Sequence, residues 1–454
     1  MSSDFSPDQK RYLEGFVSGL SASRVARTNA PAKSEPIGPD AIHLKAQDRT
    51  VAAGGKLNDQ EKFKRDEHPF DAYPRLVKQA ENNEAPKPPD NFRWRYYGIF
   101  YVAPTQTSYM CRLRIPNGIL KHWQFAGVAD LAENFGGPYA HVTTRANLQL
   151  REIEPKNAIN VIEGLQDLGL CSRGSGADNI RNVTGTSTAG IDPQEILDTR
   201  RYAREWHFHI LNDRSLYGLP RKFNVAFDGA GRIATLEETN DIAFQAVDVL
   251  EGHGVEPGIY FRLALGGITG HKDFARDTGV ILKPQEATEV ADRIIRVFIE
   301  NGDRTNRNKA RLKYVLDSWG FDKFLAAVEE KLGRKLVRVP AEAIAPRPVY
   351  DRFAHIGVHP QKQAGLNWIG VALKLGRLSL EQIRGLAKLA ADFGDGDIRL
   401  TVWQNLLISG VADANVATVT AAIEALGLST TTSALRAGLI ACTGATGCRF
   451  AAAP

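Results

Sequence analysis

The sequence is poor in cysteine and lacks any long apolar run. Its 454 residues include four cysteines, which are too few and too scattered for a disulfide scaffold. No apolar stretch has the length that a membrane-spanning helix needs, and the first residues, MSSDFSPDQKRYLEGF, carry charges where a signal peptide needs an apolar core. We therefore expect a cytoplasmic protein with no membrane segment, whose cysteines bind metal or are simply buried.

Neither sign of charge is in large excess. The formal net charge of +5 suits an acidic partner or a polyanionic cofactor, but it equally suits a solvated surface. We expect no nucleic-acid partner. With 43% hydrophobic and 24% charged residues, the composition is that of a folded protein. The length predicts about three units that each bury a core.

An internal repeat of strand, helix, strand and helix is the main structural signal. The predicted strands cover 109–115 and 141–153 in the first copy, and 366–375 and 398–411 in the second. The predicted helices cover 120–135, 157–170, 379–393 and 414–426. Short motifs recur too, since TRANL at 144–148 resembles TVWQNL at 401–406. Gene duplication is the simplest explanation, although strand–helix alternation is also common in unrelated proteins.

The segments outside the repeat have patterns of their own. Ser6, Pro7 and Gln9 predict the start of a helix over 6–20. Residues 21–55 lack sustained periodicity and predict an extended arm. Between the two copies, strands at 222–227 and 258–265 and a helix at 284–301 predict a separate middle unit.

Two strand segments carry cations on one face. Residues 110–118, MCRLRIPNG, place Arg112 and Arg114 on the same side of a strand. Residues 143–151, TTRANLQLR, form a polar wall by the same alternation. The side chains of this wall are Arg145, Asn147, Gln149 and Arg151. For either segment alone, an exposed strand face is the better explanation.

Two further segments add anion-binding donors. Residues 172–183, SRGSGADNIRNV, form a glycine-rich loop that contains Arg181, and residues 219–224, LPRKFN, place Lys222 and Asn224 on one face. A solvated loop would explain each of them separately. Around one cavity, all four segments together would suit a polycarboxylate cofactor and a small anionic substrate, because Arg and Lys pair with carboxylates and stabilise charge away from water.

A Cys-x5-Cys loop, ACTGATGC at 441–448, is the fifth signature. Its glycines allow the backbone to bend around a metal centre. Cys442 and Cys448 do not complete a site, because an iron–sulfur cube and zinc each usually need four ligands. Two buried free cysteines are the alternative. Cys111 and Cys171 could formally supply the missing pair, but they lie in or beside the cationic segments, which argues against it.

With these five signatures and the repeat, the chain resembles the sirohaem-dependent nitrite and sulfite reductases, and among them the bacterial ferredoxin-type nitrite reductases most. The resemblance covers about 92–453 and implies an α+β fold of two ferredoxin-like halves, related by a pseudo-twofold axis and flanked by sirohaem-binding α+β domains. The implied division has a helix and arm at 1–90 and a first half at 91–170. It continues with a sirohaem-binding catalytic domain at 171–345, a second half at 346–428 and the start of a cluster and sirohaem domain at 429–454.

The resemblance also implies roles for individual residues. It assigns Arg112, Arg181 and Lys222 to the substrate side of the sirohaem. The residues that would hold the sirohaem carboxylates are Arg145, Asn147, Gln149 and Arg221, with Gln404 and Asn405 as weaker candidates and with Lys309 and Arg311 from a predicted helix at 306–316. Cys442 and Cys448 would be two ligands of a [4Fe-4S] cluster.

Position 224 favours nitrite over sulfite. The sulfite enzymes resemble Lys-x-Lys at this point and the nitrite enzymes Lys-x-Asn, and this chain has Lys222-Phe223-Asn224. Nitrite is a monoanion, so its site needs one cation fewer than a site for sulfite. The implied reaction is assimilatory six-electron reduction of nitrite to ammonium, with reduced ferredoxin or a similar acidic protein as the donor.

Other interpretations remain open from the sequence. The chain could be a sulfite reductase or a related enzyme of the same fold, such as a precorrin-3B synthase. It could also be a non-catalytic product of a truncated gene that binds sirohaem weakly or misfolds.

The resemblance yields a first testable prediction. The family completes its cluster with a later Cys-x3-Cys pair, which does not follow Cys448 in this sequence. We expect the 454-residue chain, taken alone, to lack normal reductase activity, because two of the four cluster ligands are missing. Iron and acid-labile sulfide analysis of the purified chain checks this, and the full stoichiometry of the family would contradict it.

Overall fold

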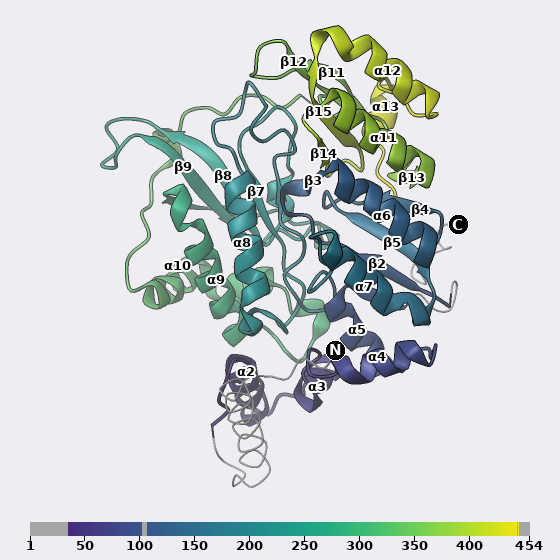
Figure 1. Cartoon of the computed structure of the whole chain (residues 1–454). Coiled ribbons are helices and arrows are strands. Elements are labelled where there is room, and N and C mark those ends of the chain that lie inside the picture. The colour runs from purple at the N-terminus through teal and green to yellow at the C-terminus, as the bar shows by residue number, and fades with distance from the viewer. Residues whose placement is uncertain (1–34, 102–106, 352, 443, 445–454) are drawn as a thin grey trace, which may run out of the picture.

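The computed structural model describes residues 35–101, 107–351, 353–442 and 444 (Figure 1). The predicted helix at 6–20, part of the predicted arm, and Cys448 lie outside these residues. No helix of the described chain is both long and apolar enough to cross a bilayer.

The described strands form three sheets of five strands. The first sheet has the order β1-β2-β5-β4-β13, the second β11-β12-β15-β14-β3 and the third β10-β9-β8-β7-β6. The strands of the first repeat are β1 (Ile99–Tyr101), β2 (Tyr109–Arg112), β3 (Ile119–Lys121), β4 (Tyr139–Val142) and β5 (Leu148–Ile153). Those of the second are β11 (Gly357–Pro360), β12 (Leu366–Val371), β13 (Arg377–Ser379), β14 (Asp397–Leu400) and β15 (Leu406–Ala412). The third sheet contains β6 (Thr184–Gly185), β7 (Val225–Asp228), β8 (Ile242–Val249), β9 (Gly258–Leu265) and β10 (Arg276–Leu282).

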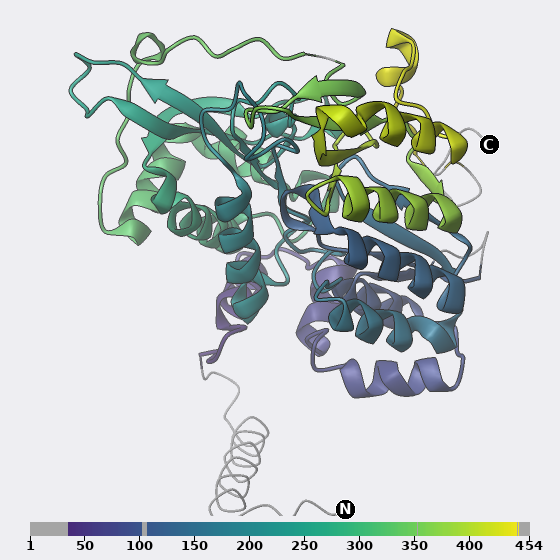
Figure 2. The same ribbon diagram turned by 45° about the horizontal axis from the view of Figure 1, so that its top comes forward.

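Helices cover the sheets and form a separate layer near the start of the chain (Figures 1 and 2). The first layer has α2 (Ala41–Ala52), α3 (Asp59–Asp66), α4 (Tyr73–Glu81) and α5 (Pro88–Trp94). The repeats contain α6 (His122–Phe135) and α7 (Ala158–Asp167), then α11 (Leu380–Phe393) and α12 (Val416–Ala425), and α13 (Ala434–Ala437) follows. The middle unit has α8 (Arg200–Asn212), α9 (Ala287–Asn301) and α10 (Leu312–Leu332).

The two repeats exchange a strand. β3 of the first repeat pairs with β14 in the second sheet, with Leu120 opposite Ile398, and β13 of the second repeat pairs with β4 in the first sheet, with Leu378 opposite Ala140. Helices α6 and α11, which begin directly after these strands, pack side by side (Figure 2). One apolar core runs through both halves as a result.

Equivalent glutamines begin the two exchanged helices in the same way. The side-chain oxygen of Gln124 accepts the backbone N–H of Lys121 (2.9 Å), and that of Gln382 accepts the N–H of Ser379 (3.0 Å). Their amide groups then donate to the carbonyls of Leu168 and Leu426. Each glutamine thus caps its helix and ties it to the end of the next helix in its own repeat. This shared detail supports duplication more specifically than the order of elements does.

The predicted elements of the repeat exist, with one systematic error. The segments 141–153 and 398–411, predicted as single strands, are hairpins of β4 with β5 and of β14 with β15. The turns contain Ala146 (φ 45°) and Gln404 (φ 60°), which occupy the left-handed region without the usual glycine or asparagine. Arg145 and Asn147 therefore lie in a turn, whereas Gln149 and Arg151 remain on β5.

Two further predictions were wrong. The expected arm at 21–55 contains α2, whose buried residues include His43 and Gln47; these polar side chains bind the carbonyl of Ser215 and the carboxylate of Glu61, so the helix shows no apolar stripe. The helix expected at 306–316 begins only at Leu312, because Arg311 has an extended backbone (ψ 158°).

The tight crossing between the halves gives the second prediction. Gly376 lies beside β13 at φ 72°, and a Cβ there would overlap the carbonyl oxygen of Val142, whereas Gly427 has the same φ and no atom of the described chain within 4 Å of such a Cβ. Gly427→Ala should cost about 1–2 kcal/mol of unfolding free energy for the left-handed backbone. Gly376→Ala should cost roughly 1–3 kcal/mol more for overpacking. Thermal or urea unfolding measures both, and equal effects would show that the crossing is not sterically tight.

Candidate active site

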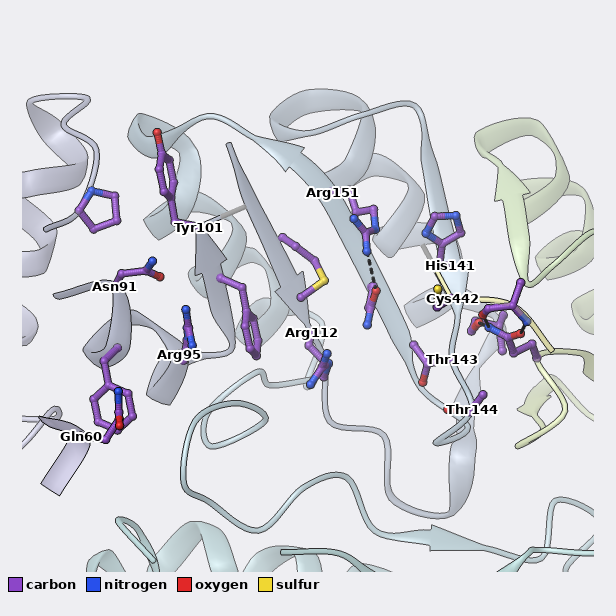
Figure 3. A pocket seen from close by; sticks show the side chains of 18 of the residues that line it. Gln60, Asn91, Arg95, Tyr101, Arg112, His141, Thr143, Thr144, Arg151 and Cys442 are labelled. Carbon is purple, nitrogen blue, oxygen red and sulfur yellow. Dashed lines mark hydrogen bonds between the residues drawn. The ribbon is translucent and has the colours of Figure 1, made fainter. Parts of the chain in front are cut away.

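A cavity of about 1070 Å³ lies against the first sheet (Figure 3). Its volume is at the upper end of those that hold cofactors and other small ligands. Its walls come from the first sheet, the turn after β4, the layer of α3 and α5, and the chain that follows α13. The polar side chains that line it include Gln60, Asn91, Arg95, Arg112, His141, Thr143, Thr144, Gln149, Arg151, Gln404 and Cys442.

The segment 110–118 carries two cations with different parts: Arg112 lines the cavity, and Arg114 supports a neighbouring loop. Arg112, at the end of β2, lines the cavity with its guanidinium 4.8 Å from the centre of the Phe100 ring. Burial and the nearby Arg151 lower the pKa of Arg112 to about 10. Arg114 is almost fully buried and donates to the carbonyl of Ile180 (2.7 Å), so it fixes the neighbouring loop.

The β4–β5 hairpin holds four predicted side chains in two different ways. Gln149 and Arg151 line the cavity, and the Arg151 guanidinium donates a hydrogen bond to the side-chain oxygen of Gln149 (3.4 Å). Figure 3 marks this bond of Arg151 with a dashed line. The amide of Asn147 is buried, donates to the carbonyl of Leu113 and accepts the N–H of Leu148, so it holds the hairpin. Arg145 reaches from the turn to the carbonyl of Asn182 (2.6 Å) and to the side chain of Asn240 (2.9 Å).

The glycine-rich loop is largely buried and holds the Arg181 side chain by its own backbone. The Arg181 guanidinium donates to the carbonyls of Ser175 and Ala177, both at 2.6 Å, while its Nε has no hydrogen-bond partner among the described residues. Burial, and then the charge of Arg112, hold the pKa of Arg181 well below its ordinary value. The charge of Arg112 therefore acts on Arg181.

Lys222 and Asn224 flank a buried phenylalanine. Phe223 pairs with Ile180 in a short bridge, and both side chains lie in the core of the middle unit. The neighbouring side chains alternate to the opposite face. Burial and the charges of Arg181 and Arg311 lower the pKa of Lys222 to about 7. The side-chain oxygen of Asn224 is buried and accepts no hydrogen bond from the described part of the protein.

Two buried carboxylates hold the remaining cations. Asp178 accepts both terminal nitrogens of Arg307 (2.7 and 2.8 Å), and Arg221 lies 3.9 Å away. Asp241 accepts Arg311 through two nitrogens (2.7 and 3.1 Å). The sequence interpretation assigned neither acid a role. Asp178 stands inside the glycine-rich segment, which was a usable signal, whereas nothing in the pattern distinguishes Asp241.

A lysine from the first helical layer also supports these loops. The buried ammonium of Lys64, on α3, donates to the carbonyls of Leu219 (2.9 Å) and Gly218 (3.3 Å) and lies 3.5 Å from Asp178. It thus ties α3 to both the glycine-rich loop and the segment that carries Lys222. Sequence reasoning missed it, because a lone lysine on a short polar helix predicts exposure.

The second repeat contributes a bridge to the cysteine segment. Gln404 donates to the carbonyl of Ala441 (3.0 Å) and accepts its N–H (2.9 Å), which places the next residue, Cys442, at the cavity wall. Asn405 is buried and accepts the N–H of Leu373 (2.8 Å). It therefore supports the second hairpin as Asn147 supports the first. Lys309 is exposed and is not among the residues that line the cavity.

The corresponding face of the second half is filled. Gly370 stands opposite Leu407 in the second sheet, where Arg112 stands opposite Gln149 in the first. An apolar cluster covers this face, and its buried members are Ile191, Ile233, Ala354, Trp368 and Leu407. Duplication thus produced two similar frames, and in the described chain the cationic cavity lies on the first.

The donors around the cavity fit a large anionic group. Arg112 lines the cavity, whereas Arg145, Arg181 and Lys222 are not among its lining residues. The Nε atoms of Arg145 and Arg181 are buried without hydrogen-bond partners in the described chain. Burial and the neighbouring cations lower the pKa of Lys222, so this region has spare donors and excess positive charge. A macrocycle with several carboxylates would satisfy both. The Cys442 thiol at the same wall is a soft ligand of the kind that iron prefers.

Comparison with known families agrees with this arrangement. A model described as the nitrite and sulphite reductase 4Fe-4S domain matches residues 176–336. A model of the nitrite/sulfite reductase ferredoxin-like half domain matches twice, at 101–168 and 359–426. The double match confirms the predicted α+β fold with two ferredoxin-like halves.

Individual proteins match over most of their length. The chain is 35% identical over 416 residues to the ferredoxin–nitrite reductase of Synechococcus elongatus, covering 89% of this chain and 79% of that protein. It is 36% identical to the ferredoxin–nitrite reductase of Leptolyngbya laminosa, covering 79% and 70%. The solved structure of the Mycobacterium tuberculosis NirA protein superposes with a TM-score of 0.79 at 29% identity, over 87% of this chain and 74% of that one.

Burial and the crowding of cations predict a lysine with an unusually low pKa. Lys222 should titrate near pH 7, so the site loses one positive charge as the pH rises through neutrality. Between pH 7 and the ordinary range of lysine, the unfolded chain binds the proton that the folded chain has released, so this group alone makes the folded state more stable as pH rises. NMR of the reductively ¹³C-methylated protein measures this titration, with Lys222→Gln identifying the signal. A midpoint near pH 10 would contradict the prediction.

Proposed function

Because the chain belongs to the nitrite and sulfite reductase family, we propose that it reduces nitrite to ammonium with six electrons. The observation that carries the proposal is a cavity that Arg112 and Cys442 line, together with the buried cations Arg181 and Lys222, which are linked to Arg112 electrostatically. Two relatives that cover most of the chain are named ferredoxin–nitrite reductases. We infer that the reaction serves nitrate assimilation and that reduced ferredoxin, or a similarly acidic protein, supplies the electrons.

The cofactors that fit are sirohaem and a [4Fe-4S] cluster. When bound, they would supply an iron site for the substrate and a route for electrons. Arg145, Gln149 and Gln404 would contact the sirohaem or its carboxylates directly, and Arg221 and Arg311 would add positive charge beside it. Asn147 and Asn405 would support the site indirectly, because their side-chain amides hold the turns of the two hairpins. Lys309 would join only through its exposed side chain, and Cys442 and Cys448 would be cluster ligands.

The protein's own cations would handle the substrate and its protons. Arg112 and Arg181 stay charged at neutral pH and can hold an anion by hydrogen bonds. Lys222 can do more, because its pKa of about 7 lets its Nζ both attract the anion and release a proton near the working pH. The buried oxygen of Asn224 faces the same side without adding charge.

Sulfite is the second candidate substrate, since the family includes enzymes for both anions. The residue at position 224 discriminates between them in our proposal. An asparagine leaves the site with one cation fewer than a lysine would, which favours a monoanion. We also propose the unit boundaries 91–170, 171–345 and 346–428, within which the matched ranges fall.

A binding experiment tests this assignment, because anion affinity does not require electron transfer. Sirohaem-loaded protein is titrated with nitrite and with sulfite, and the change in its visible spectrum gives both dissociation constants. Asn224→Lys should shift the ratio toward sulfite by roughly tenfold, the effect of about 1.4 kcal/mol from one added charge.

The matched control adds the same charge elsewhere. Asn134 is exposed on α6, and Asn134→Lys should leave the ratio unchanged. An unmodified protein that prefers sulfite would overturn the nitrite assignment. A ratio that is unchanged in Asn224→Lys would instead show that position 224 does not discriminate between the two anions.

A further inference from the structure

Asp241 is a buried acid that contacts two of the predicted site residues and has no assigned role. It lies immediately before β8, with only 1% of its surface exposed. Its carbonyl accepts the N–H of Gly266 (2.9 Å), and the next residue, Ile242, donates to the carbonyl of Asn224 (3.1 Å). These backbone bonds hold the Asp241 carboxylate at the start of two parallel strands, β7 and β8.

The carboxylate of Asp241 binds two predicted site residues at once. One oxygen accepts the backbone N–H of Asn224 (2.8 Å) and a terminal nitrogen of Arg311 (2.7 Å). The other accepts the Nε of Arg311 (3.1 Å). A two-point pairing of a carboxylate with a guanidinium fixes the plane of both groups. Asn224 and Arg311, which are far apart in sequence, are thus placed relative to each other by one side chain.

Charge gives Asp241 a second role. Lys222 faces Arg181 from the glycine-rich loop, Arg311 from the segment before α10 and its own neighbour Arg221, and all three disfavour its charged form. Asp241 faces it from the start of β8 and favours the charged form. Asp178, the other buried acid of the site, is committed to Arg307 and Lys64.

We propose that Asp241 is a positioning residue of the anion site, whose buried carboxylate fixes the backbone of Asn224 and the guanidinium of Arg311 and supplies a counter-charge to the cations around Lys222. This inference deepens the proposed function and rests on it for its meaning in catalysis. It separates two properties of the site: the cations attract the anion, and the Asp241 carboxylate offsets part of their mutual repulsion at Lys222.

Asp241→Asn is the direct test, because the amide keeps the size of the side chain and one acceptor for the Asn224 N–H. It removes the negative charge and turns N–H groups toward Arg311 or Asn224. The titration of ¹³C-methylated Lys222 in the purified protein is the readout. We expect the midpoint to fall by at least one pH unit, a tenfold loss of proton affinity. If Asp241 only held the fold together, its replacement by asparagine would not lower the Lys222 midpoint.

Two further variants make the result specific. Asp241→Glu keeps the charge and should leave the Lys222 midpoint within about half a unit of the unmodified protein. Asp292→Asn is the matched control, since Asp292 is also buried and paired with an arginine, Arg296 (2.7 Å), in the same unit. It should not move the midpoint.

The outcomes separate this inference from the proposed function. An unchanged Lys222 midpoint in Asp241→Asn, or a midpoint in Asp241→Glu that falls by a full unit, would overturn the role of Asp241. Failure of nitrite to bind the sirohaem-loaded protein would overturn the proposed function, while the Lys222 titration would still report on Asp241. If both the proposed function and the role of Asp241 hold, nitrite affinity at pH 7 should be about fivefold weaker in Asp241→Asn. A fall of the Lys222 midpoint by one unit lowers the charged fraction of Lys222 at pH 7 by about that factor.

Discussion

Mutual repulsion among buried cations is the constraint on which the site depends. Two unit charges 4 Å apart repel by about 4 kcal/mol at the effective dielectric of a protein near its surface. Arg112, Arg145, Arg181 and Lys222 all have lowered pKa values, for which burial is the first cause and neighbouring cations contribute. Asp178 and Asp241 offset part of this charge. An anionic ligand would offset more of it, so the charge of this site is best understood as prepared for a bound anion.

The frame that keeps these cations together comes from the exchange of strands between the repeats. With β3 in one sheet and β13 in the other, neither half can shift without breaking a ladder of the other half. The first helical layer adds a support through Lys64, which binds both cation-bearing loops. The two faces then diverged on this common frame: one became cationic around Arg112, and the other was filled with apolar side chains around Trp368.

Regular elements were predictable where side-chain periodicity reports burial, as for β9, whose predicted and observed bounds agree, and for α11, which begins one residue later than predicted. The hairpin turn at 143–147 was not, because the alternation of Arg145, Asn147 and Gln149 imitates a strand and Ala146 gives no sign of its left-handed backbone. The charged segments themselves could be recognised. Their counter-charges could not, since Asp241 acquires its meaning only from contacts with Asn224, 17 residues away, and Arg311, 70 residues away.

The central claim is that the cavity on the first half is built to hold a polycarboxylate macrocycle among these cations. Its most direct test is the visible spectrum of the purified protein after expression together with the enzymes of sirohaem synthesis. The account predicts a Soret band that corresponds to about one sirohaem per chain, weakened when Arg145 is replaced by Gln. A protein that is folded by circular dichroism yet shows no Soret band would contradict it.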